Sequence, residues 1–135
     1  MIEIAIRTLL LADVTVAALV GARVYSGLPP QRPTAPYVQL WKVDRVAGLS
    51  LDGVPTRSVA RIQVDCYAGD HDAVRALAAA VNGDDGQTTA GPLHGYVGTV
   101  AGVRINRLEL SLERGTQFEE DTKLYRVSAD YLVRL

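Results

Sequence analysis

The sequence is poor in the residues that build most catalytic, metal and disulfide sites. Its 135 residues include one cysteine, Cys66, and two histidines, His71 and His94. A single cysteine excludes a disulfide within the chain and fits a reducing compartment. Cys66 lies in an alternating apolar stretch, so we expect a thiol that behaves as a small hydrophobic side chain.

A surplus of charge and a long apolar run are also lacking. The 14 basic and 15 acidic residues give a formal net charge of −1 and are scattered along the chain, so no strong field would attract phosphate and we predict no nucleic-acid binding. Near the N-terminus the longest apolar run, Leu9 to Ala12, is far shorter than the roughly 20 residues of a membrane span and lacks signal-peptide features. We therefore expect no membrane partner and a cytoplasmic protein in the cell that makes it.

The composition is that of a folded globular protein. Hydrophobic residues make up 48% and charged residues 21% of the chain. A chain of this length can bury a hydrophobic core. With no internal repeat and no linker, residues 1–135 are expected to form a single domain.

The N-terminal third reads as helices followed by a proline-rich segment. The spacing of Ile2, Ile6, Leu9 and Leu10 predicts a first helix with one apolar side. Asp13 can cap a short second helix, with Leu19 on its apolar face and Gly21 as a left-handed C-cap. Four prolines within residues 26–36 exclude regular structure there.

Two strands and a helix follow. Residues 37–46 predict a strand, in which Trp41 is either a core residue or an interface anchor, the core being favoured. Residues 58–68 alternate cleanly, which indicates one buried and one wet face, and glycines between the strands mark a hairpin-like connection. Residues 72–81 predict a helix capped by Asp70 or Asp72 and ended by Asn82 and Gly83, before a polar, glycine-rich loop over residues 82–91.

The C-terminal third predicts a long antiparallel hairpin. Residues 107–112 and 125–135 alternate and are joined by residues 113–121. Val103 and Ile105 have the opposite parity, so a bulge near Asn106 would reconcile the two halves. Together these elements predict an α+β fold: an antiparallel sheet with an N-terminal helical segment and one central helix packed on one face.

The candidates for chemistry are few, and each has a structural alternative. His71 between Asp70 and Asp72 could form a metal or acid–base site, but a helix-capping turn explains these residues better. Cys66 and His71 could form a nucleophilic pair, but Cys66 has the parity of a buried core thiol. The acidic residues 119–121 lack the spacing of a calcium loop and suit a solvated hairpin tip. His94 reads as a loop histidine, and no phosphate-binding or nucleophile-elbow motif is present. We predict no catalytic, metal or cofactor-binding residues.

The segment Val16 to Tyr25, with its Val-Gly helix end and Arg-x-Tyr, and the Pro-Tyr-Val start at Pro36 resemble the opening of the tail-completion (tail-terminator) family of long-tailed phages and prophages. Residues 61–68, leading into the helix, and the alternating end from Leu124 are similar to the family's central and last elements. The resemblance covers nearly the whole chain.

This resemblance implies a non-enzymatic virion subunit without cofactors. Such proteins form a closed ring of identical copies, commonly a hexamer, that caps the tail tube and faces the head connector. The implied partners are copies of the chain, the tail-tube protein and the head–tail connector protein. The implied location is the head-proximal end of the virion tail, after assembly in the host cytoplasm.

Position in the sequence suggests which residues contact partners. Loops on a rigid scaffold often carry function, which favours the proline-rich arm and the tip of the C-terminal hairpin, although both could be plain surface loops. The predicted partner-contacting residues are Leu28, Pro30, Arg32, Pro33, Tyr37, Trp41, Arg114, Gln117, Phe118, Glu119 and Glu120. Two alternatives stay open: a head–tail connector or adaptor subunit, and a small α+β enzyme or ligand-binding domain that uses His71.

Overall fold

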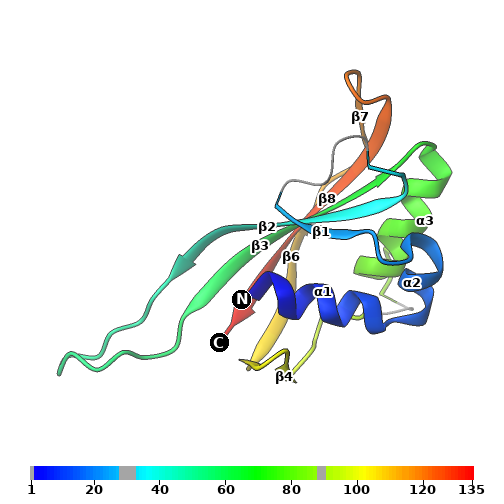
Figure 1. Cartoon of the computed structure of the whole chain (residues 1–135). Helices are drawn as coiled ribbons and strands as arrows, with labels where there is room; N and C mark the ends of the chain where they lie inside the picture. The colour runs from blue at the N-terminus through cyan, green and yellow to red at the C-terminus, as the bar shows by residue number, and fades with distance from the viewer. Residues whose placement is uncertain (1, 28–32, 88–90) are drawn as a thin grey trace.

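The computed structural model describes residues 2–27, 33–87 and 91–135 and has an α+β fold (Figure 1). The elements, in chain order, are α1 (Ile2–Ala12), α2 (Val14–Val20), β1 (Val24–Ser26), β2 (Tyr37–Val46), β3 (Val59–Ala68), α3 (His71–Asn82), β4 (Gly98–Val100), β5 (Val103–Ile105), β6 (Arg107–Glu113), β7 (Gln117–Glu119) and β8 (Leu124–Arg134).

The predicted N-terminal helices and their cap are present. The Asp13 side chain accepts a hydrogen bond from the backbone N–H of Val16 at 3.0 Å, which satisfies a donor that the first turn of α2 would otherwise leave unpaired. Gly21 ends α2 with φ +60° and ψ −123°. Its φ has the expected left-handed value, but its ψ lies outside the left-handed helical region. Leu19, expected on the apolar face, is 36% exposed because only Val16 and Val20 of α2 face the core.

The main sheet has the order β1-β2-β3-β8-β6, with β7 pairing farther along the same edge of β8. All neighbours are antiparallel except β1 and β2, which run parallel. The fully antiparallel sheet expected from the sequence is therefore wrong at this one pair. The long connection over residues 27–36 carries the chain back to the start of β2, which allows the parallel pairing that a tight turn forbids.

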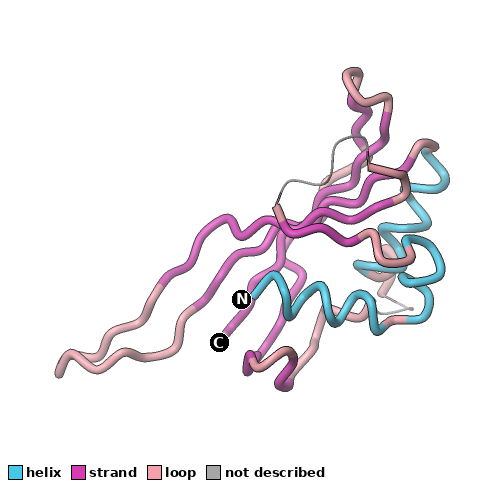
Figure 2. The backbone as a smooth tube through the Cα atoms, in the orientation of Figure 1, coloured by secondary structure: helices cyan, strands magenta, loops and turns pink. Residues whose placement is uncertain are grey.

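The three helices pack on one face of this sheet (Figures 1 and 2). The predicted buried parities of β3 and β8 are confirmed: residues such as Ile62, Val64, Ala129 and Val133 are fully buried. They join the buried sides of α1, α2 and α3 in one hydrophobic cluster. The predicted apolar side of α3 is confirmed as well, and Asp70 is its N-cap.

The C-terminal hairpin is confirmed, with two differences. The stretch expected to connect its strands contains β7, so the turn itself lies between Glu119 and Leu124. Near Asn106 the chain has a break between β5 and β6 rather than a bulge, since β5 pairs with β4 in a separate two-stranded sheet. The irregularity in the β6–β8 register falls between Leu110 and Leu112 instead, and Leu112 is 52% exposed.

Candidate interaction surfaces

The face of the sheet opposite the helices carries an ion-pair network around Asp130. Arg114 donates two hydrogen bonds to the Asp130 carboxylate, at 3.2 and 3.1 Å, in a bidentate arrangement, and Arg61 lies 3.8 Å from the same group. The Asp130 carboxylate raises the pKa of Arg114. Asp130 is only 5% exposed, whereas the arginines remain half-exposed. Arg114, a predicted partner-contacting residue, is therefore already paired within the chain.

The same face contradicts the expectation of a wet side on β3. Asp65 is 2% exposed and accepts hydrogen bonds from the Gln63 amide at 2.9 and 3.2 Å. Gln39 of β2 is buried too and donates to the backbone oxygen of Gly27 at 2.7 Å. Asp65 lies between the buried cross-strand neighbours Gln39 and Ser128, so polar side chains pack against one another on this face.

An aromatic row crosses the start of this face. The ring of Tyr37 stacks on that of Tyr67 at 4.8 Å and lies 5.9 Å from that of Tyr25. Burial, together with the neighbouring phenol of Tyr67, raises the pKa of Tyr37 to about 12. Tyr37, a predicted partner-contacting residue, is only 4% exposed. Of the predicted proline-rich arm, Leu28, Pro30 and Arg32 lie outside the described residues, and Pro33 is half-buried.

The β7–β8 hairpin holds four more of the predicted contact residues, Gln117, Phe118, Glu119 and Glu120, and three of them are paired within the chain. Arg126 contacts both Gln117, at 2.7 Å, and Glu119, at 3.1 Å. Lys123 lies 3.2 Å from Glu120. Phe118 packs 4.9 Å from the ring of Tyr125 and stays 45% exposed.

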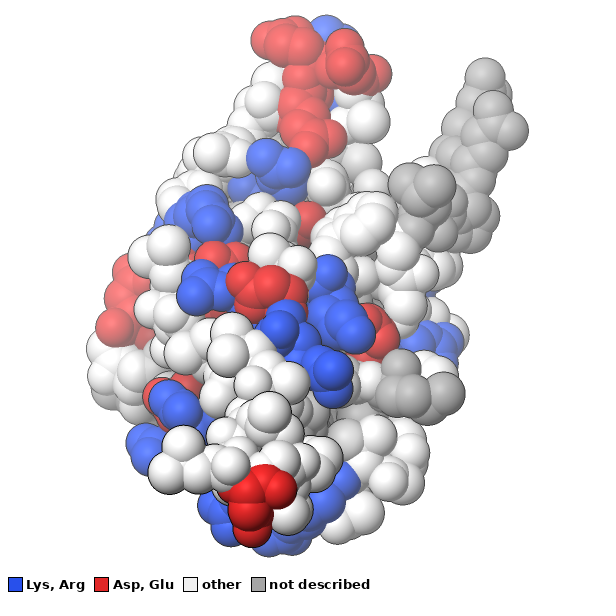
Figure 3. Space-filling model, turned by 90° about the vertical axis from the view of Figure 1, so that its left-hand side faces the viewer, with Lys and Arg blue, Asp and Glu red and all other residues white. Residues whose placement is uncertain are grey.

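Seen from the side toward which the β2–β3 hairpin points, basic and acidic side chains intermix (Figure 3). A group of acidic side chains stands at the upper end, where the β7–β8 turn lies.

Among the described residues, several exposed aliphatic side chains gather in the far part of the β2–β3 hairpin, residues 42–58, which we call the arm. It extends away from the helices and from the rest of the sheet (Figures 1 and 2). Trp41 at its base is 37% exposed, so the core interpretation of this residue is wrong. The exposed aliphatic residues of the arm are Val43 (52%), Val46 (70%), Leu49 (70%), Leu51 (111%) and Val54 (55%).

Hydrogen bonds within the arm fix the conformation of its tip. Ser50 bonds to the Asp52 carboxylate and to the backbone of Val54 at 3.0 and 3.2 Å. The N–H of Thr56 donates to the oxygen of Gly48 at 3.0 Å, and a Cβ at Gly48 would collide with the Thr56 side chain. The tip therefore presents Leu51 in a defined position. Sequence analysis missed it, although the aliphatic residues between the glycines of the connection were a signal.

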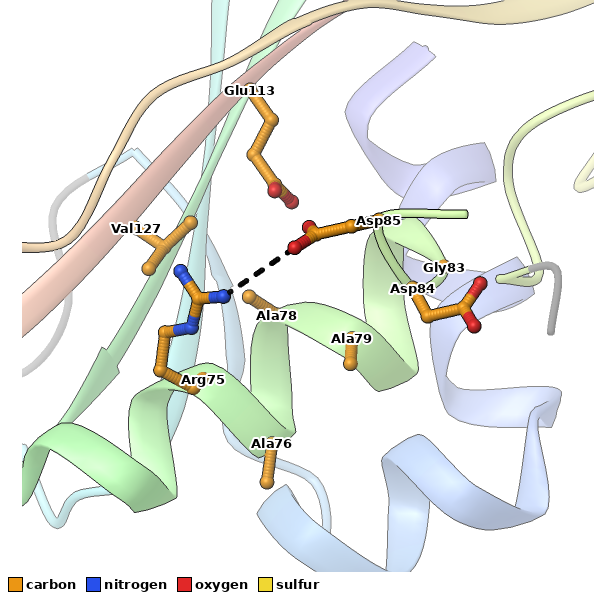
Figure 4. A pocket seen from close by; sticks show the side chains of 9 residues that line it. All are labelled: Arg75, Ala76, Ala78, Ala79, Gly83, Asp84, Asp85, Glu113 and Val127. Carbon is orange, nitrogen blue, oxygen red and sulfur yellow. Dashed lines mark ion pairs between the residues drawn. The ribbon is translucent and has the colours of Figure 1, made fainter. Parts of the chain in front are cut away.

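One cavity, of about 320 Å³, lies beside α3 (Figure 4). Arg75 and Asp85 face each other across it at 3.8 Å, and its floor includes small alanine side chains. Glu113, on its wall, accepts a hydrogen bond from Asn82 at 2.7 Å, and Asn82 in turn accepts one from the Tyr131 hydroxyl at 2.6 Å. These polar groups are paired with one another, and the arrangement offers no nucleophile with an adjacent base.

The candidate catalytic residues are not assembled into a site. Cys66 is fully buried, and this burial raises the pKa of its thiol, as for an inert core cysteine. His71 lies 3.7 Å from Asp72 on the surface and edge-on to the Tyr125 ring. His94 accepts a hydrogen bond from the N–H of Leu110 at 2.9 Å and so covers part of the edge of β6. Within residues 2–27, 33–87 and 91–135, no three His, Cys, Asp or Glu side chains are grouped to hold a metal ion.

The family model described as "Tail completion protein gp17" matches residues 4–135. The chain belongs to this tail completion protein family. The resemblance read from the Val-Gly, Arg-x-Tyr and Pro-Tyr-Val segments is thereby confirmed, and the family is one of structural phage tail proteins.

A solved structure supports the fold of this tail completion protein. A chain in the structure titled "Virion of native gene transfer agent (GTA) particle" superposes with a TM-score of 0.75 at 23% sequence identity, over 98% of this chain and 92% of that chain. At this identity the likeness concerns the fold. A search of the curated proteins gave no match. Among the described residues, no helix combines the length and apolarity that crossing a membrane requires.

Proposed function

We propose that this tail completion protein is a structural subunit whose copies form a closed ring, a hexamer, on the end of a phage-like tail tube. The ring caps the tube and joins it to the head connector. The observation that carries the proposal is the family match over residues 4–135, nearly the whole chain. On the same ground we treat residues 1–135 as one tail-completion-like domain.

The exposed elements support a role in assembly. A ring of identical copies needs heterologous contacts that close by rotation. Strand β1 pairs with Val38 to Leu40, and within residues 2–27, 33–87 and 91–135 no strand pairs with the outer edge of the later part of β2, which carries exposed apolar residues. Trp41, Phe118 and Glu120 are the predicted contact residues that we place at partner interfaces, because they remain exposed on projecting elements.

The partners we propose are copies of the chain, the tail-tube protein and the head–tail connector protein. The site of action is the head-proximal end of the tail, and the subunits assemble in the host cytoplasm. We propose no enzymatic activity, cofactor, nucleic-acid ligand or membrane contact, because the titratable candidates described above serve packing, capping and edge protection.

Size-exclusion chromatography with light scattering, on the protein alone and mixed with tail tubes, tests this function. We expect a complex of several copies that binds tube ends. A protein that stays monomeric and never binds tube ends would refute the proposal. Labelled copies in assembled particles separate a tail-end position from one within the connector.

A further inference from the structure

The arm tip combines an apolar side chain with a carboxylate. Leu51 is entirely solvent-exposed, and the neighbouring Asp52 is exposed as well. The hydrogen bond from Ser50 lowers the pKa of Asp52, so this group is an anion at neutral pH. Leu51 gains no burial from its own chain, so its side chain is free to be buried against another molecule, which would stabilise that contact.

A second cavity lies at the base of the arm and has the complementary character. It measures about 340 Å³ and is lined by Arg57, Ser58, Val59, Asn106, Arg107, Arg134 and Leu135. A volume of this size lies at the lower end of the range of small-ligand pockets, roughly 300–1,000 Å³. Aliphatic side chains and arginine stems form much of its wall, so it can accept a leucine.

The arginines make the rim of this cavity cationic. Arg107 and Arg134 both contact Glu109, at 3.1 and 2.9 Å, so two positive charges share one carboxylate. Arg57 makes no hydrogen bond or ion pair with any residue in the described parts of the chain. A carboxylate placed beside a leucine in this cavity would find a free guanidinium at its rim.

The tip of a chain cannot enter its own cavity. Seven residues of chain separate Leu51 from Ser58, a length that spans at most about 25 Å, and the tip lies at the far end of the arm from the C-terminus that marks the cavity (Figure 1). Folding the tip back would bend the arm across the hydrogen bond from Thr56 to Gly48 and the pairing of Val46 with Val59. The occupant with the required reach, apolar side chain and charge is the arm of a second copy.

We propose that Leu51 of one copy inserts into the cavity between Val59 and Leu135 of the next copy, with Asp52 paired to Arg57 at its rim. This contact is heterologous, because the arm tip of one copy binds the cavity at the base of the arm of the next copy. Each copy uses both surfaces, so a row of copies can close into a ring. The inference deepens the proposed function and rests on it, since a ring of identical copies needs such a contact.

Disulfide cross-linking between two single variants tests this contact. Leu51→Cys and Ser58→Cys proteins, mixed in equal amounts with and without tail tubes under mild oxidation, should give a disulfide-linked pair. Because bound neighbours hold the two thiols at high effective concentration, we expect at least about tenfold more linked pair than in controls. The controls are each variant alone and Val14→Cys, another exposed position, mixed with Ser58→Cys. The native Cys66 is buried and does not compete.

The outcomes separate this contact from the proposed function. No excess of linked pair, while the unmodified protein oligomerises or caps tubes, overturns the contact and leaves the ring. Efficient linkage of Leu51→Cys with itself also overturns it, because that result indicates a two-fold, tip-to-tip interface. A protein that neither self-associates nor binds tubes refutes both.

A charge reversal provides the second variant set. Asp52→Arg and Arg57→Asp should each weaken association, and a chain carrying both should recover most of it, since each interface again pairs opposite charges. Leu51→Asp should weaken association at least about 30-fold, the size of an interface hot spot. No recovery in the double variant, with the single variants folded and weakened, contradicts the Asp52–Arg57 pairing.

Discussion

The two halves of strand β2 show how differently one strand can be used. The first half, from Tyr37 to Leu40, is buried on both faces, between helices on one side and polar cross-strand neighbours on the other. From Trp41 onward every residue is exposed, although both halves carry β-forming residues. The first half therefore adds side chains to the core, whereas the second half pairs with β3 through its backbone but leaves its side chains exposed and available for assembly.

Matched leucine truncations in the two halves give the largest expected difference. Leu40→Ala removes a fully buried side chain and should lower the free energy of unfolding by about 2–5 kcal/mol. Leu49→Ala, on the arm, should change it by less than about 0.5 kcal/mol. Denaturant unfolding of both variants measures the contrast. Equal losses would mean that the arm packs against the body of the protein in solution.

A set of buried, hydrogen-bonded polar side chains in the body of the protein should give the next largest effect on the free energy of unfolding. Asn82→Ala leaves the buried Tyr131 hydroxyl without its acceptor, which should cost about 1–3 kcal/mol of unfolding free energy. A double-mutant cycle with Tyr131→Phe is the control: the Tyr131 change should cost less in the Asn82→Ala background. Additive losses would contradict the coupling.

Tyr37 should give the smallest effect, confined to alkaline pH. Burial raises its folded-state pKa to about 12, above the ordinary value of 10, so the folded chain keeps a proton that the unfolded chain loses. The stability is therefore full below pH 10 and is lost as the pH rises from 10 toward 12. Thermal melts across this range should fall less steeply for Tyr37→Phe, although Tyr67, whose pKa is also raised, keeps part of the effect. An identical fall in both proteins would contradict the assignment to Tyr37.

Local patterns in the sequence predict much of this fold. The alternation around Val64 and Ala129 and the capped ends of α3 depend on residues close in the chain. The strands β3 and β8 with their buried faces, and the helix α3, could therefore be predicted. The burial of Asn82 could not, because its partners Glu113 and Tyr131 lie 31 and 49 positions away. The burial of Asp130 could not be predicted either, because its partners Arg114 and Arg61 are also distant from it in the sequence.

The candidate interaction surface was predictable only in part. Alternation indicates which face of a strand is apolar but not whether another element covers it, so alternation alone does not distinguish the buried Leu40 from the exposed Leu49. The predicted contacts at Arg114 and Glu119 follow from their place in a connecting loop, yet the fold gives both of them partners within the chain. The arm is apparent only in the structure, where the pairing of β1 with β2 ends at Leu40 and the pairing of β8 with β3 begins at Val59.

Electron microscopy of purified tail tubes incubated with the protein tests the central claim most directly. The account predicts a ring of density on one end of each tube, which the unmodified protein forms and the Leu51→Asp protein forms poorly. Tubes whose ends stay bare at saturating protein would contradict the claim that this chain is a structural subunit that completes the tail.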